Sequence, residues 1–134
     1  MKKIICAILP LLLTTGCMNP EGGDTMNTQY TSITPEQAAE MIRTDQTLIV
    51  VDVRRKEEYE EAHLKDAVLI PNETIGSEKP KELPDFDQKI LIYCRSGVRA
   101  KQAAQKLVTI GYTDVYEFGG IIDWKGETVS SRGS

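Results

Sequence analysis

Short apolar runs alternate with segments of helical spacing along most of the chain. Residues 48–53, 67–71 and 89–93 are almost continuously apolar, a pattern typical of strands that are covered on both faces. Residues 30–33 predict a short strand at the sheet edge, and residues 115–118 predict a last strand. Because these strands alternate with helices, we predict an α/β fold in three layers, with a central, mostly parallel sheet of about five strands flanked by helices.

Capping residues and apolar spacing mark the helices between these strands. Thr34 suits an N-cap, Pro35 the first helical position and Gln37 the reciprocal bond of a capping box, so a helix is expected to begin there. Residues 56–62 predict a short, charged helix. Residues 98–110 carry apolar side chains at helical spacing before a glycine that ends the helix. Each predicted helix thus connects two predicted strands, as a parallel sheet requires.

The first segment has the pattern of an export signal. Lys2 and Lys3 precede an apolar run over residues 4–13, and a run of ten residues would cover only about half the hydrocarbon core as a helix. The small residues before Cys17 resemble the lipobox of bacterial lipoproteins, in which the cysteine is lipid-modified, although Thr14 stands where that pattern usually has leucine. We therefore predict a lipidated Cys17; the alternative is an ordinary secretory signal cleaved nearby.

This interpretation divides the chain into four parts. They are a signal peptide over residues 1–16, the lipidated cysteine with a flexible tether over residues 17–30, a single domain over residues 31–127 and a C-terminal tail over residues 128–134. The protein would then be exported and anchored by its lipid to a bacterial cell-envelope membrane, facing the periplasm or the cell exterior.

Charge and cysteine usage exclude several function classes. With 16 Lys and Arg against 20 Asp and Glu, the formal net charge is −4, and there is no basic block beyond the first three residues, which argues against a nucleic-acid partner. Three cysteines without CxxC spacing and one histidine do not provide a zinc site. If the signal is removed and Cys17 is acylated, Cys94 is the one free thiol in an oxidising compartment, which suggests a chemical role.

Cys94 lies where an open parallel sheet binds its ligands. It directly follows the strand predicted over residues 89–93, and the next residues lead to the start of the helix over 98–110. Gly97 can adopt the positive φ of a tight loop, while Arg95, Arg99 and the helix dipole all favour the ionised thiolate. We predict an anion cradle with a nucleophile at its base; the alternative is a buried structural cysteine.

The same loop resembles the active-site loop of single-domain rhodaneses, which are thiosulfate sulfurtransferases. Its residues are Cys94, Arg95, Ser96, Gly97, Val98 and Arg99. Other landmarks of that family follow in order over residues 31–126: Asp52-Val53-Arg54, Glu58-Tyr59, residues 62–67, Ile70-Pro71, Gly119-Gly120 and Trp124. One departure is Ala62-His63-Leu64, where the family usually has Gly-His-Ile.

The resemblance implies a two-step transfer of sulfur. Cys94 would take sulfur from a small sulfur-containing anion such as thiosulfate and hold it as a persulfide, and cyanide or a thiol would then accept it. Residues 95–99 would bind the substrate, with Arg99 at its sulfonate end. No cofactor and no metal are implied. His63 and the Asp52–Arg54 pair are expected to be structural.

Two other function classes remain open. Cys-dependent phosphatases and arsenate reductases of related fold resemble Cys-x5-Arg, whereas here the sixth position after the cysteine is Ala100 and the arginine is at the fifth. A redox-sensing or binding module is the third possibility, because an exposed, ionised thiol is what such sensors use.

Overall fold

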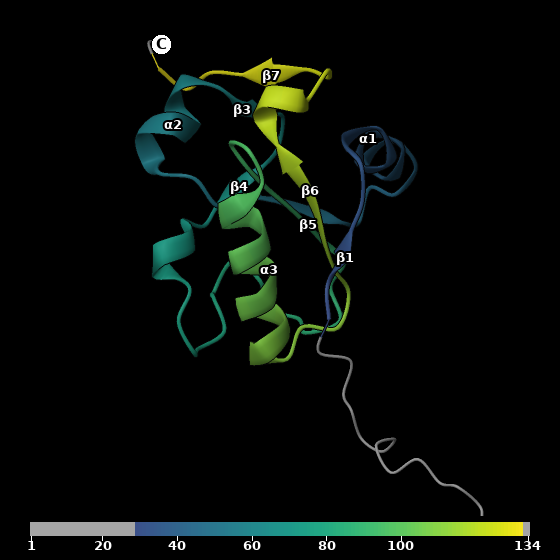
Figure 1. The fold of residues 1–134 in the computed structure, drawn as a ribbon, viewed down its shortest axis with the longest axis vertical. Coiled ribbons are helices and arrows are strands. Elements are labelled where there is room, and N and C mark those ends of the chain that lie inside the picture. Colours follow the sequence, from purple (N-terminus) through teal and green to yellow (C-terminus); the bar gives the residue numbers. More distant parts are fainter. Residues whose placement is uncertain (1–28, 133–134) are drawn as a thin grey trace, which may run out of the picture.

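The computed structural model describes residues 29–132. Its main sheet has five strands and lies between helices (Figure 1). The strand order is β1 (Thr31–Ser32), β6 (Val115–Gly120), β5 (Ile90–Cys94), β2 (Ile49–Asp52) and β4 (Val68–Leu69). All four pairings in this sheet are parallel. The predicted α/β fold with a parallel sheet of five strands is therefore confirmed.

Helices α1 (Pro35–Thr44), α2 (Lys56–Glu61) and α3 (Val98–Ile110) connect successive strands, and short 3-10 turns η2 (Asn72–Thr74) and η3 (Ile121–Asp123) follow β4 and β6. The predicted capping box at the start of α1 is present: the Gln37 backbone N–H donates to the Thr34 hydroxyl and the Thr34 N–H donates to the Gln37 side chain. The predicted bounds of α3 are those observed. These elements follow from local sequence signals.

Two hydrophobic clusters lie on opposite faces of the sheet. Ile90 and Ile92 of β5 pack in the cluster that contains the small residues of α3, whereas Leu91 and Tyr93 pack in the cluster that contains Ala38 of α1. Alternate residues of a strand point to opposite faces, so α1 and α3 cover different sides of the sheet. This arrangement gives the three layers, and it explains why β5 is apolar at every position.

A two-stranded antiparallel sheet lies beside the main one. It pairs β3 (His63–Leu64) with β7 (Thr128–Val129). Neither strand was predicted from the sequence, and Thr128–Val129 fall in the segment that the sequence assigned to the tail. Just beyond β7, the Ser131 backbone N–H donates to the Glu60 carbonyl oxygen at 3.0 Å. The end of the described chain therefore packs against α2.

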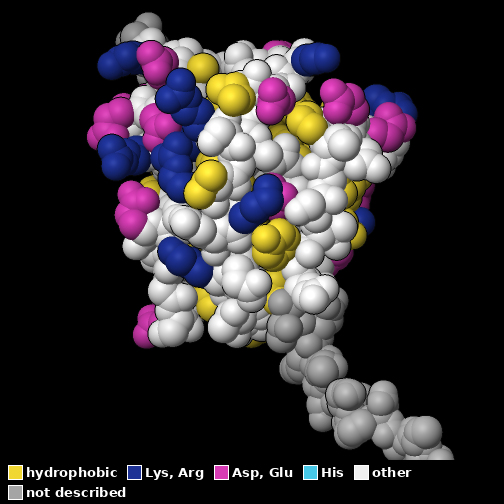
Figure 2. All heavy atoms as spheres, in the orientation of Figure 1, with side chains coloured by type: hydrophobic (Ala, Val, Ile, Leu, Met, Phe, Trp, Pro, Cys, Tyr) yellow, Lys and Arg dark blue, Asp and Glu magenta, His cyan; other side chains and the backbone are white. Residues whose placement is uncertain are grey.

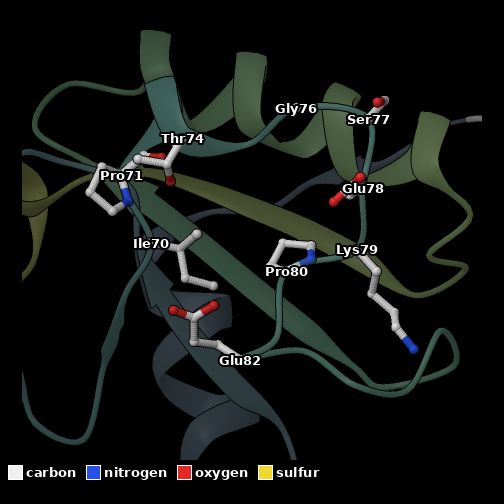
Figure 3. Close-up of a pocket in the computed structure, with 9 residues that line it drawn as sticks. All are labelled: Ile70, Pro71, Thr74, Gly76, Ser77, Glu78, Lys79, Pro80 and Glu82. Carbon is white, nitrogen blue, oxygen red and sulfur yellow. The ribbon is translucent and has the colours of Figure 1, made fainter.

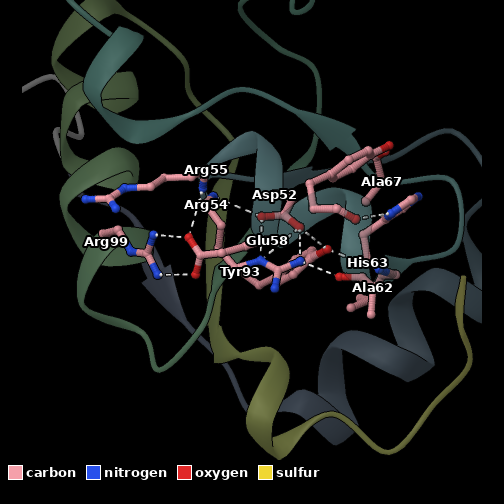
Figure 4. A network of polar contacts seen from close by, with 11 residues as sticks. Asp52, Arg54, Arg55, Glu58, Ala62, His63, Ala67, Tyr93 and Arg99 are labelled. Carbon is pink, nitrogen blue, oxygen red and sulfur yellow. Dashed lines mark hydrogen bonds and ion pairs between the residues drawn. The ribbon is translucent and has the colours of Figure 1, made fainter. Parts of the chain in front are cut away.

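A buried polar network joins the carboxyl ends of β2 and β5 (Figure 4). The Asp52 carboxylate accepts bonds from the Arg54 guanidinium, at 2.7 Å for the shortest, and from the Tyr93 hydroxyl at 2.6 Å. Arg54 also donates to the Ala62 carbonyl oxygen, and the Leu64 N–H donates to the Tyr93 hydroxyl. Buried charges and hydroxyls are tolerated when each has such partners. The expected structural pairing of Asp52 with Arg54 is thus present, and it fixes the residue that precedes Cys94.

The segment after β5 crosses the end of β6 in close contact. Cys94 pairs with Gly120 after an irregularity in the ladder, and the Ile122 N–H donates to the Arg95 carbonyl oxygen at 3.3 Å. A Cβ atom on Gly120 would lie 1.7 Å from that oxygen and 2.6 Å from the Ser96 Cα, so only glycine fits. Gly119 and Gly120 are the last two residues of β6.

Glu117 supports this crossing from below the surface. Its carboxylate, 2% exposed, accepts bonds from the Gly119 N–H at 2.9 Å and from the Ser32 hydroxyl at 2.6 Å, and it lies 3.2 Å from the Lys101 ammonium. Gly119 has a φ of 86°, in the left-handed region. The buried carboxylate therefore links β1, α3 and the end of β6.

We expect Gly120→Ala to displace the loop after Cys94, because the added methyl group overlaps the Arg95 carbonyl. Overpacking of this kind costs about 1–3 kcal/mol of unfolding free energy. Gly76→Ala is the matched control, since a Cβ there has no neighbour within 4 Å and the change should stay within about 0.5 kcal/mol. Urea unfolding measures both. Equal stabilities for the two variants would contradict the close crossing.

Candidate active site

Cys94 is the last residue of β5, and its side chain is 1% exposed. The Gly97 backbone N–H donates to the Cys94 Sγ, with 2.9 Å between nitrogen and sulfur. Gly97 reaches this position with a φ of 112°, the left-handed conformation that the sequence predicted, and α3 begins at the next residue. The sulfur therefore lies against a backbone donor at the positive end of a 13-residue helix, an environment that stabilises a thiolate.

The remaining residues of the loop differ in their surroundings. Arg95 and Ser96 are exposed, and Val98 leaves 63% of its surface open although it is apolar. Arg99, on the first turn of α3, is half-buried. Of the predicted site residues, Gly97 contacts the Cys94 sulfur directly, and Arg99 has a partner that the sequence did not predict.

Arg99 forms a two-bond ion pair with Glu58 of α2 (Figure 4). Its two terminal nitrogens lie 2.8 and 3.1 Å from the two carboxylate oxygens. The hydrogen bonds from Arg99 lower the pKa of Glu58 from 4.5 to about 2, against the raising effect of its partial burial. They also raise the pKa of Arg99, with a smaller contribution from the nearby Cys94. Glu58 is consequently ionised at every physiological pH.

Glu58 appeared in the sequence only as a landmark of the resemblance. A signal was present, because an acid at the third position of a short helix can cap that helix, and Glu58 does accept from the Arg55 N–H at 3.0 Å. The pairing with Arg99 spans 41 residues, however, and arises only because α2 and α3 start beside adjacent strand ends. Local patterns do not report such contacts.

An open cavity of about 850 Å³ adjoins the loop. Its lining residues are charged, with both signs represented equally: Arg55, Arg95, Arg99, Glu57, Glu58 and Glu73. Figure 2 shows the same mixture of Lys and Arg with Asp and Glu over α2. A donor molecule approaching Cys94 from this side therefore meets a rim of balanced charge.

A second cleft of about 450 Å³ follows the segment between β4 and β5 (Figure 3). It is lined by residues between Ile70 and Glu82, with the side chains of Thr74, Lys79 and Glu82 at its walls. No residue of the loop over positions 94–99 lines it. The cleft thus lies apart from the loop, whereas Arg95 and Arg99 of the loop line the charged cavity.

His63 is held by structural contacts. Its Nδ1 lies 2.7 Å from the Tyr59 carbonyl oxygen, and its ring stacks on that of Tyr59 at 3.7 Å between centroids. Trp124 packs against Phe118 with 5.6 Å between ring centroids. His63 thus matches the structural role expected from the sequence, and Trp124 is half-buried against one of the two hydrophobic clusters.

Within residues 29–132, no group of three or more His, Cys, Asp or Glu side chains is arranged to hold a metal ion. Nor does that part of the chain contain a helix with the length and apolar character to cross a membrane. The predicted signal peptide and Cys17 lie outside the described residues.

The Glu58–Arg99 pair should make stability depend on pH. Because the pKa of Glu58 is about 2 in the folded protein and 4.5 ordinarily, its stabilising effect is present above pH 4.5 and declines as the pH falls toward 2. Glu58→Gln should cost about 1 kcal/mol at pH 7 and less at pH 3, measured by urea unfolding. Glu57→Gln, which changes an exposed acid of the same helix, is the control. A difference that stays constant with pH would contradict the pairing.

Comparison with known proteins agrees with this geometry. The family model described as the rhodanese-like domain matches residues 34–127. The tRNA uridine(34) hydroxylase of Hamiltonella defensa is 32% identical over 75% of this chain and 30% of its own length. The probable adenylyltransferase/sulfurtransferase MoeZ of Mycobacterium tuberculosis is 34% identical over 69% of this chain and 24% of its own. The chain thus spans less than a third of the length of these curated relatives.

Solved structures show the same likeness. A structure of rhodanese with anions from E. coli is 31% identical, with a TM-score of 0.57 over 61% of this chain and 96% of that one. A rhodanese-like domain protein from Staphylococcus aureus is 29% identical, with a TM-score of 0.61 over 72% of this chain and 93% of that one. With the matched family model, the sheet topology and the loop around Cys94, these likenesses show that the chain belongs to the rhodanese-like domain family.

Proposed function

We propose that this domain is a sulfurtransferase that carries sulfur as a persulfide on Cys94. The observation that carries the proposal is the bond from the Gly97 N–H to the Cys94 Sγ at the start of α3. A donor placed there stabilises the thiolate before reaction and the terminal persulfide anion after it.

The first step moves one sulfur atom to the enzyme. The Cys94 thiolate attacks the outer sulfur of thiosulfate, a sulfur–sulfur bond forms to Cys94, and the sulfur–sulfur bond of thiosulfate breaks with its electron pair leaving on sulfite. One thiolate and one dianion thus become one persulfide anion and one dianion. In the second step, cyanide or a thiolate attacks the terminal sulfur, and the Cys94 thiolate leaves.

The residues next to Cys94 would bind the donor in this scheme. We assign substrate binding to Arg95, Ser96, Gly97, Val98 and Arg99. Arg95 and Arg99 line the cavity beside the loop, and the Gly97 N–H donates to the Cys94 sulfur. Arg99 is expected to bind the sulfonate end of the donor. Because its guanidinium is bonded to Glu58, the donor would have to share it with that carboxylate.

The site supports sulfur transfer better than phosphoryl transfer. Hydrolysis of a phosphate ester usually requires an acid that protonates the leaving oxygen, whereas sulfite leaves without a proton. Glu58, the acid bonded to the loop arginine, has a pKa of about 2 and is therefore not a proton donor at neutral pH. The name of the mycobacterial relative includes sulfurtransferase, which adds support.

Mass spectrometry of the purified protein tests this function. Excess thiosulfate should increase the mass by one sulfur atom, cyanide should remove that atom with release of thiocyanate, and Cys94→Ser should abolish both changes. Sulfite in place of thiosulfate is the control, since it has no outer sulfur to give. Phosphatase activity that depends on Cys94, without a persulfide adduct, would replace this proposal with the phosphatase alternative.

We propose as well that the domain is exported and held at a bacterial cell-envelope membrane by lipid on Cys17. The support is the charged start, the apolar run over residues 4–13 and the small residues before Cys17. Stable anchoring takes more than one acyl chain, which a lipoprotein-type modification would supply.

Cell fractionation with intact-mass measurement tests the anchor. Cys17→Ser should release the protein from the membrane fraction or leave the signal uncleaved. Cys6→Ser is the matched control, because Cys6 lies in the apolar run that would be removed and should leave anchoring intact. Wild-type protein found wholly in the soluble fraction, with an unmodified Cys17, would contradict the proposal.

A further inference from the structure

Arg99, on the first turn of α3, is already paired with a carboxylate in the folded protein. Both terminal nitrogens of Arg99 bond the carboxylate of Glu58, with side chains that are only 30% and 29% exposed. Two parallel bonds of this kind hold the guanidinium in one orientation. An incoming anion that uses Arg99 must therefore share it with, or displace, a fixed carboxylate.

The other charged residues of the cavity rim do not restore a net positive charge. Arg55 and Arg95 add two positive charges, but Glu57 and Glu73 add two negative ones to the same lining. A rim whose charges cancel gives a donor dianion little electrostatic attraction to compensate for the water it loses on binding. A donor with one negative charge loses less hydration and meets half the repulsion from Glu58.

We propose that Glu58 is a specificity-determining residue: by holding Arg99, it selects singly charged sulfur donors, such as organic thiosulfonates and persulfide anions, over the thiosulfate dianion. This inference rests on the proposed function, because it assumes that Cys94 accepts sulfur. Thiosulfate in excess still transfers sulfur to Cys94, but it binds the site less well than a singly charged donor does.

The reaction with a singly charged donor is balanced in the same way. The Cys94 thiolate attacks the terminal sulfur of a thiosulfonate anion, and a sulfinate anion leaves with the electron pair of the broken sulfur–sulfur bond. Two anions enter and two leave, the persulfide on Cys94 and the sulfinate. No oxidant, reductant or proton is required.

Single-turnover loading of Cys94 tests the selection without the acceptor step. The probes are thiosulfate and methanethiosulfonate, which differ by a methyl group in place of one charged oxygen. Glu58→Gln leaves the charge of Arg99 uncompensated, and one such unit charge about 6 Å from the donor, in a water-like medium, changes binding about threefold for each donor charge. Glu58→Gln should therefore increase second-order loading about tenfold with thiosulfate and about threefold with methanethiosulfonate.

Glu57→Gln is the matched control. It removes the same charge from the same helix and cavity lining, but Glu58 keeps its bonds to Arg99, so both donors should change by less than about twofold. Equal effects of the two variants would mean that bulk charge, not the release of Arg99, controls loading, and would overturn the proposal. Slower thiosulfate loading by Glu58→Gln would overturn it too, by showing that Glu58 positions Arg99 for the dianion.

The salt dependence of the wild-type protein gives a test that needs no variant. A rim of balanced charge predicts that thiosulfate loading changes less than about twofold between low and physiological ionic strength. A steep loss with added salt would show that an uncompensated positive site attracts the dianion, against the proposal. If no donor produces a persulfide on Cys94, the proposed function itself fails; if both donors do so without these charge effects, only the role of Glu58 fails.

Discussion

The close approach of the Arg95 carbonyl to the backbone of Gly120 is the constraint on which the site depends. It lets the chain leave β5 and curl back over the end of β6 within three residues, so that the Gly97 N–H reaches the Cys94 sulfur. A side chain at position 120 would hold the two segments apart. The geometry around the nucleophile thus comes from the absence of one methyl group on a neighbouring strand.

The surrounding structure keeps this crossing in place from two sides. The network of Asp52, Arg54 and Tyr93 fixes the end of β5 just before the cysteine, and the buried Glu117 bonds the Gly119 N–H on β6. Each group is buried with its partners satisfied, so either network resists rearrangement because breaking it would leave a polar group without a bond. Rigid supports of this kind allow a short loop to hold a sulfur against a single backbone donor.

The charge around the site depends on a contact between the loop and α2. The loop has two arginines, which by themselves predict strong attraction of anions, but the tertiary structure places an ionised glutamate on one of them. Glu58 has two contacts. It accepts a hydrogen bond from the Arg55 N–H at the start of α2, and it pairs with Arg99. A residue that stabilises a helix start thereby sets the electrostatic character of the cavity beside the nucleophile.

The sequence by itself determined the layered fold, through the alternation of apolar strands with helices along the chain. It also determined the bounds of α3, the capping box of α1 and the positive φ of Gly97, because each of these depends on residues that are close together in the chain. It also identified Cys94 at a strand end, where parallel sheets collect ligands. Only the tertiary structure decided the pairing of β3 with β7, whose strands of two residues are too short to show periodicity. The same holds for the contacts of Arg99 with Glu58 and of Arg95 with Gly120, because they join segments distant along the chain whose proximity follows from strand order rather than from any local pattern.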